Sequence, residues 1–205
     1  MKKLVLPIIA LFFFSFSADT NKLTDDERAT LIKYLEETRD HMKSVLDGLS
    51  EEQLNYKPTE ESWSIAECAE HLAISENAFS GLIQKAVAAG PNPTLKDSVK
   101  LKDDQLFGII TDRSNKVKTA EPFEPSGKFG SHEDTVKAFM EKRGEHIEYV
   151  KTTEDDLRNR FSNDLPFGTV DGFQIVMFAA GHTERHVLQM EEVMKDREFP
   201  EYSQE

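Results

Sequence analysis

Two histidines near the end of the chain, His182 and His186, have the spacing of a metal-binding pair. They stand in the segment AAGHTERHVLQM, and residues four apart lie one above the other on the same face of a helix. The other residues along that line of the helix are apolar, and an imidazole that faces a core needs a partner. One bound metal ion would satisfy both rings. The pair alone is weak evidence, because six histidines in 205 residues give roughly 0.2 such pairs by chance.

A third histidine, His71, would complete a metal site. It lies in the segment SWSIAECAEHL, beside the apolar positions Cys68 and Leu72. If the helix that carries His71 packs against the helix of the pair, the three rings meet across the core. Three neutral imidazoles with an open fourth position are typical of catalytic zinc sites. The alternative is three core histidines that are satisfied by hydrogen bonds and bind no metal.

Four segments with helical periodicity must position these residues. They place apolar side chains on one face and span residues 24–50, 64–86, 131–150 and about 171–195. The connection between the second and third segments is long enough to run the length of a bundle, and we expect a short helix in it near residues 103–111. The pattern therefore predicts an all-α fold. We expect a four-helix bundle with a long crossover between helices two and three, which need not be antiparallel.

The first residues, MKKLVLPIIALFFFSFSADT, are typical of a signal peptide. Lys2 and Lys3 precede an apolar run that is too short to span a bilayer comfortably, and small residues follow it. We therefore expect residues 1–17 to be removed and the domain of residues 18–205 to be exported to the periplasm or the extracellular space. An uncleaved membrane anchor is the alternative, but no stable membrane anchor is expected.

The composition narrows the class of partner. The formal charge of −13 becomes −15 once two positive residues, Lys2 and Lys3, leave with the signal peptide. A surface this acidic disfavours nucleic acid and anionic membranes as partners, so a small-molecule substrate is expected. Cys68 is the single cysteine of the sequence, which excludes an internal disulfide. Its apolar surroundings favour a core residue over a catalytic thiol.

Three segments together resemble the sequence pattern of the DinB/YfiT-like superfamily of metalloenzymes. They are ESWSIAECAEHLA, FMEKRGEHI and GHTERHVLQM, in the family's order, and the resemblance covers roughly residues 24–195. Its specific part is the W-S-x-x-E-x-x-x-H block together with the H-x-x-x-H-x-x-Q block. The resemblance implies a four-helix bundle with a long connection between helices two and three. It also implies a metal ion held by His71, His182 and His186.

Four further polar residues are weaker candidates for the surroundings of the ion. Gln189 lies on the same side of its helix as the histidine pair and could orient an imidazole or contact substrate. Ser75 and Glu67 lie one turn after and one turn before His71, although a capping box already explains Glu67. Arg143 matches an arginine that is frequent in the family. We expect it to pair with a buried carboxylate rather than with a substrate anion.

The remaining polar residues near these motifs are not assigned to the site. The segment HTERH resembles the H-E-x-x-H motif of zinc proteases only superficially, because Glu184 points about 200° away from His182 around the helix. We expect Glu184 to be a solvated surface acid. His41, His132 and His146 match no motif and are expected to be structural or surface residues. No residue is assigned as catalytic.

The resemblance implies two enzymatic activities. One is a metal-dependent hydrolase that acts through a metal-bound water, and the other is a transferase or isomerase that uses a low-molecular-weight thiol activated by the metal. Export favours the hydrolase, because such thiols are concentrated in the cytosol. A protein that binds a metal or a small ligand without catalysis is the third alternative. Zinc is the first expectation for the ion and nickel the second, and a homodimer is expected because relatives commonly pair.

Overall fold

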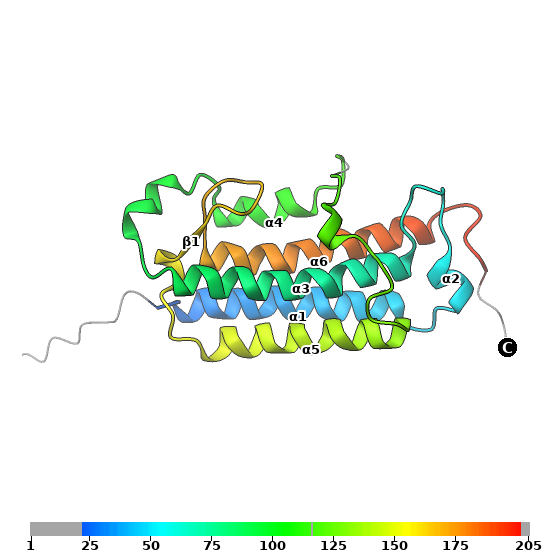
Figure 1. Cartoon of the computed structure of the whole chain (residues 1–205), viewed down its shortest axis with the longest axis horizontal. Coiled ribbons are helices and arrows are strands. Elements are labelled where there is room, and N and C mark those ends of the chain that lie inside the picture. The colour runs from blue at the N-terminus through cyan, green and yellow to red at the C-terminus, as the bar shows by residue number, and fades with distance from the viewer. Residues whose placement is uncertain (1–21, 116, 202–205) are drawn as a thin grey trace, which may run out of the picture.

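Four long helices form the body of the part of the chain that the computed structural model describes, residues 22–115 and 117–201. They are α1 (Asp25–Leu46), α3 (Ile65–Ala88), α5 (His132–Thr152) and α6 (Gly172–Met194). α6 packs between α1 and α3, and α5 packs against the same two helices, so the four close into one bundle (Figure 1). The predicted all-α four-helix bundle is confirmed. The expected signal peptide, residues 1–17, lies outside the described residues.

The long crossover between α3 and α5 lets these two neighbours run in the same direction. α1 and α6 run one way along the bundle, and α3 and α5 run the other way (Figure 1). Within the crossover lie the 3-10 helices η1 (Pro93–Ser98) and η2 (Glu121–Phe123), with α4 (Asp103–Thr111) between them. α4 packs along the outer face of α6. The short helix expected near residues 103–111 is therefore present, and it covers the helix that carries the histidine pair.

The first helix ends earlier than its periodicity predicts. It stops at Leu46, and Gly48 turns the chain with a φ of 72°, a conformation that glycine adopts without steric cost. Ser50 then caps a separate short helix, α2 (Glu51–Asn55). The prediction of one helix through residues 24–50 is thus wrong at its end, because the apolar spacing continues across a turn that only the glycine reveals.

Two short strands lie in the connection between α5 and α6. The 3-10 helix η3 (Leu157–Asn159) leads into β1 (Phe161–Ser162), which pairs antiparallel with β2 (Val170–Asp171). Elements of two residues are too short to produce an alternating pattern, which is why the sequence does not predict them. Within the described residues, no helix combines the length and the apolar character that crossing a membrane requires.

Side-chain caps fix where the long helices begin and so fix the rotation of their faces. Capping boxes form at Thr24 and Ser64, while Ser131 and Asp171 each accept a backbone N–H from the first turn of α5 and α6. Each such cap stabilises its helix by about 1 kcal/mol.

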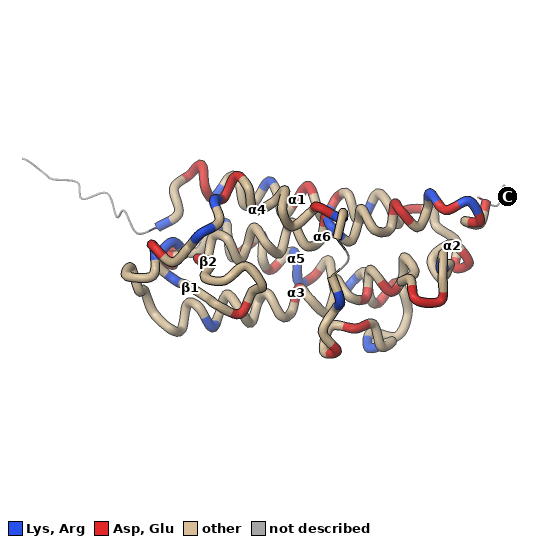
Figure 2. Tube along the Cα trace, turned by 90° about the horizontal axis from the view of Figure 1, so that it is seen from above, with Lys and Arg blue, Asp and Glu red and all other residues tan. Residues whose placement is uncertain are grey.

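α3 and α6 are the most deeply buried helices. Charged residues of both signs are interspersed along the molecule (Figure 2).

Candidate metal centre

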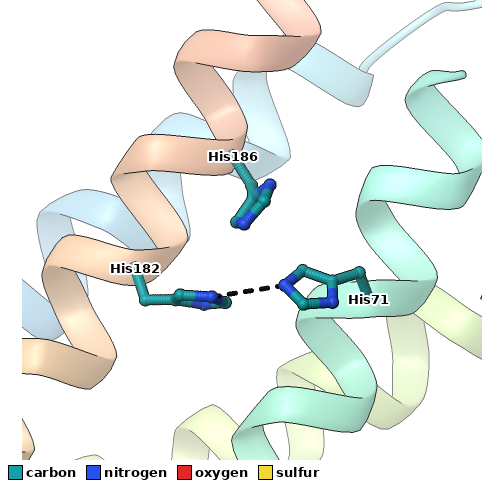
Figure 3. Close-up of side chains that lie close together, drawn as sticks. All are labelled: His71, His182 and His186. Atoms are coloured by element: carbon teal, nitrogen blue, oxygen red, sulfur yellow. Dashed lines mark hydrogen bonds between the residues drawn. The ribbon is translucent and has the colours of Figure 1, made fainter. Parts of the chain in front are cut away.

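Three histidines from two helices converge on one point. His71 on α3 faces His182 and His186 on α6 (Figure 3). One ligand nitrogen from each ring lies within 4.8 Å of those of the other two, and the Nε2 atoms of His71 and His182 are 3.2 Å apart. The three rings are also in mutual contact, with centroids 4.4 to 5.0 Å apart. The residues that spacing and resemblance selected therefore form one cluster, called here the histidine cluster.

The crossover orients His71. Its Nδ1 lies 2.8 Å from the backbone carbonyl oxygen of Phe123 in η2. A carbonyl oxygen only accepts, so Nδ1 must carry the proton and Nε2 must present its lone pair to the cluster. The indole of Trp63 packs against the same ring, with centroids 4.9 Å apart. The tautomer and the orientation of His71 are therefore both fixed by neighbouring groups.

Gln189 orients His186 in the same way. Its Oε1 lies 2.9 Å from Nδ1 of His186 and also accepts a hydrogen bond of 3.3 Å from Nη1 of Arg113. Arg113 can only donate, which identifies the shared amide atom as the oxygen and places the proton of His186 on Nδ1. Arg113 is itself held by two hydrogen bonds to the carboxylate of Glu192, 2.8 and 2.7 Å long. The Nε2 lone pair of His186 is thereby left for the cluster.

His182 is surrounded by apolar groups rather than by polar supports. Its ring contacts the rings of Phe79 and Phe178, with centroids 5.4 and 5.8 Å away. The buried Nδ1 of His182 has no hydrogen-bond partner among the residues that the structure describes. Apart from the 3.2 Å contact of its Nε2 with His71, this histidine is therefore held by packing, unlike the other two.

Burial keeps all three imidazoles neutral. It lowers the pKa of His182 to about 3, with a further contribution from nearby His71, and it lowers the pKa of His186 well below its ordinary value. Burial also lowers the pKa of His71, although the hydrogen bond to Phe123 acts in the opposite direction. The neutral ring is the form that binds metal ions. The donor set of three neutral imidazoles, two of them with a fixed tautomer, therefore fits a divalent ion.

Two cavities in the described part of the chain reach the histidine cluster. The larger has a volume of about 660 Å³, and its lining includes all three histidines, Ser75 and many apolar side chains. The smaller, of about 460 Å³, is lined by His186, Gln189 and several charged residues. Both volumes are in the range of small-molecule sites. The candidate residues Ser75 and Gln189 thus lie in these linings.

Arg143 lies behind the histidine cluster and lines neither of these cavities. Its Nε and Nη2 donate to the two carboxylate oxygens of Glu76 at 3.0 and 2.5 Å. His146 Nδ1 lies 2.9 Å from the same carboxylate. All three side chains are buried. This group, called here the ion cluster, gives Arg143 the buried carboxylate partner that the sequence predicts.

Two acidic residues of the motifs face away from the histidine cluster. The carboxylate of Glu67 accepts the backbone N–H of Ser64 and pairs with Lys57 at 2.7 Å, so its contacts belong to the start of α3. Glu184 lies 3.1 Å from Nδ1 of His41. Its side chain is 19% exposed, so the expectation of a solvated surface acid is wrong. A histidine on α1 shields Glu184, which a reading of α6 alone does not show.

The sequence does not predict the supports that come from the crossover. Besides Phe123 and Arg113, these include Glu70, whose carboxylate accepts the backbone N–H groups of the loop that follows η2. The three bonds come from Ser126, Gly127 and Lys128, at 3.0, 3.0 and 2.7 Å. An acid next to His71 and a glycine in the loop were the available signals. Neither indicates which distant segment the acid holds.

Comparisons with known proteins agree with this fold and this resemblance. Residues 34–190 match the family model of the DinB superfamily. Over 148 residues the chain is 26% identical to YuaE of Bacillus subtilis (strain 168), a protein named as uncharacterized, covering 72% of this chain and 87% of that protein. The solved structure of YfiT from Bacillus subtilis, described as a probable metal-dependent hydrolase with an unusual four-helix bundle topology, aligns with a TM-score of 0.56 and 13% identity, covering 84% of this chain and 89% of YfiT. Because the family model spans most of the chain, the protein belongs to the DinB superfamily.

Proposed function

We propose that this protein is a metal-dependent hydrolase whose divalent ion, zinc before nickel, is held by His71, His182 and His186. The observation that carries the proposal is the convergence of three neutral imidazoles on one point beside a cavity of about 660 Å³. The likeness to YfiT, which is described as a probable metal-dependent hydrolase, supports the class of reaction.

The chain's own residues would prepare the site for such an ion. When bound, a divalent ion with three histidine ligands supplies a Lewis acid at a position open to water, and it lowers the pKa of that water to near 7. The Phe123 carbonyl and Gln189 hold two of the rings, a support whose loss from metal sites typically costs 10- to 100-fold in metal affinity. Trp63 and the aromatic rings around His182 pack against the ligand rings and cover part of their surface.

A hydroxyl in the cavity favours an enzyme over a protein that only binds its ligand. Ser75 is buried on α3 and lines the cavity that contains the three histidines. Its Oγ can donate a hydrogen bond to a substrate oxygen or accept one from a substrate amide. Ser75 is thus a hydroxyl that a substrate in this cavity could contact.

Metal analysis of three proteins tests the proposal. Residues 18–205, expressed without a histidine tag, should contain about one metal ion per chain by elemental analysis. His186→Ala should lose the ion, whereas His132→Ala, which removes a half-buried histidine outside the cluster, should keep it. Absence of metal in the unmutated protein, even after incubation with Zn²⁺ and Ni²⁺, would overturn the metal site.

Turnover assays then separate the reactions. The metal-loaded protein is expected to hydrolyse activated esters or amides without a co-substrate, and His186→Ala is expected to lose this activity. Turnover that requires an added low-molecular-weight thiol would replace the hydrolase with the transferase. A loaded protein without either activity would indicate a binding protein.

Export is a separate proposal and rests on residues 1–17 alone. We expect the full-length chain to be cleaved after about Ser17 and to accumulate outside the cytoplasm. Mass spectrometry of the mature N-terminus tests this, and an intact Met1 on membrane-bound protein would favour the anchor instead.

A further inference from the structure

The larger cavity beside the histidine cluster has mostly apolar walls. Large apolar side chains from α3, α4, α6 and the β1–β2 connection line it. They include Phe79, Leu82, Ile109, Leu165, Phe167 and Phe178. Since the three histidines lie in the same lining, a ligand group bound at them can extend its apolar portion along these side chains. A cavity of this character selects an apolar group.

Two large apolar side chains at the same place are exposed. Among the described residues, Ile109 and Val117 are the large hydrophobic side chains that stay exposed, at 43% and 75%. Both line this cavity, and Val117 also lines the smaller one. They lie in the crossover, which packs over α6, and their exposure would fall if a ligand filled the space. Apolar side chains that gather at the rim of a cavity mark a binding site.

The second cavity is polar and shares part of its lining with the first. It has a volume of about 460 Å³, and its charged residues include Glu61, Arg113, Lys118 and Glu124. His186 and Arg185 belong to the linings of both cavities. The histidine cluster therefore lies at the junction between an apolar and a polar space.

We infer that the substrate is an amphiphile, an ester or amide whose apolar acyl chain lies in the larger cavity and whose polar portion lies in the smaller one. The scissile bond is then at the junction, beside His186. The inference rests on the proposed function for the bond that is cleaved. The binding of the acyl chain depends only on side chains of this protein, and it needs no metal.

Straight-chain alcohols test the chain-binding part on the metal-free protein. Isothermal titration with butan-1-ol, hexan-1-ol and octan-1-ol should give dissociation constants that fall about three- to fourfold for each added methylene. The binding should show a negative heat-capacity change, the signature of buried apolar surface. Dissociation constants that do not depend on chain length would overturn the inference.

Matched substitutions on α3 place the alcohol in the cavity. Ala78 lines the cavity, so Ala78→Phe should fill part of it and weaken octan-1-ol binding at least tenfold. Ala88→Phe adds the same ring at an exposed position of the same helix and should leave binding unchanged. Ile109→Ser removes an exposed rim residue without disturbing the core and should weaken binding severalfold. Equal binding by both phenylalanine variants would contradict the assignment.

The outcomes distinguish this inference from the proposed function. A protein that binds metal and hydrolyses short esters, but shows no chain-length dependence with the alcohols, keeps its function and loses the inferred substrate class. A protein that binds the alcohols in the cavity but no metal keeps the chain-binding site and loses the hydrolase. Hydrolysis of p-nitrophenyl octanoate that is faster than that of p-nitrophenyl acetate would support both the hydrolase and the amphiphilic substrate. Ala78→Phe should abolish this rate difference, and Ala88→Phe should not.

Discussion

The histidine cluster and the ion cluster bury polar groups in opposite ways. In the histidine cluster, burial keeps the rings neutral, and the hydrogen bonds to Phe123 and Gln189 turn the Nε2 lone pairs of His71 and His186 toward the cluster. In the ion cluster, full charges are buried, and every nitrogen of the Arg143 guanidinium donates a hydrogen bond. The histidine cluster joins α3 to α6, whereas the ion cluster joins α3 to α5, so α3 contributes to both.

The contrast shows which cluster holds the bundle and which is free to bind. Arg143 on α5 donates to groups on all three of the other long helices. The acceptors are the Leu35 carbonyl and Thr38 on α1, Glu76 on α3, and the Ala179 carbonyl and Thr183 on α6. The Arg143 guanidinium therefore has no nitrogen left for a ligand, and its bonds fix the helices relative to one another. The histidine cluster, by contrast, lines the cavities.

Removing the buried carboxylate should give the largest effect and confine it to stability. Glu76→Gln leaves the Arg143 charge buried without its counter-ion, and breaking a buried pair in this way costs about 3 to 5 kcal/mol. Urea unfolding of the metal-free protein measures this loss. Glu145→Gln on α5 breaks only the exposed pair with Lys142 and should change the unfolding free energy by less than about 1 kcal/mol. Equal stability of the two variants would show that the ion cluster does not hold the bundle.

Acid should weaken the ion cluster within a defined pH window. Burial alone would raise the pKa of Glu76, but Arg143 and His146 outweigh it and lower the pKa from 4.5 to about 2. The unfolded chain therefore takes up a proton near pH 4.5 while the folded chain remains unprotonated at this site. The contribution of Glu76 to stability is fully present above pH 4.5 and is lost as the pH falls toward 2.

A comparison of unfolding free energies from pH 6 to pH 3 checks this window. The difference between the unmutated protein and Glu76→Gln should stay constant above about pH 5 and shrink below pH 4.5. A difference that does not change with pH would contradict the lowered pKa of Glu76.

The sequence predicts the helices well because their signals are local. Periodic apolar faces and the capping residues at Thr24 and Ser64 lie within the segments that they specify, so three of the four long helices begin and end close to the predicted residues. The sequence does not predict the end of α1, because the apolar spacing of this helix continues past the turn at Gly48. The two-residue strands are too short to show an alternating apolar pattern, and they pair with each other across one connection.

The residues of the site can be predicted from the sequence only where they stand in a local helical motif. The i, i+4 spacing of the pair on α6 and the motif around His71 identified three members of the histidine cluster. Phe123, Arg113 and Glu70 support the cluster through contacts between a helix and irregular backbone far away in the sequence, and such contacts leave no periodic signal. The same limit applies to the ion cluster, for which the sequence predicted a carboxylate partner for Arg143 but could not choose Glu76 among 38 acidic residues.

The smallest of these effects is expected for Gln189, which orients a metal ligand but contributes little to the stability of the fold. Gln189→Leu removes the acceptor of the His186 Nδ1 proton and frees the ring to rotate. Metal affinity should fall about 10- to 100-fold, while the stability of the metal-free protein should change little because Gln189 is only half-buried. Competition with a chromogenic chelator measures the affinity.

Glu67→Gln provides the matched control on α3. It removes a carboxylate that caps the helix and pairs with Lys57, so stability should fall by at most about 1 kcal/mol while metal affinity stays unchanged. If Gln189→Leu bound metal as tightly as the unmutated protein, the orientation of His186 would have to come from packing, as it does for His182. The reverse result, with Glu67→Gln weakening metal binding, would make the start of α3 part of the site, because a shift of its first turn would then move His71 relative to α6.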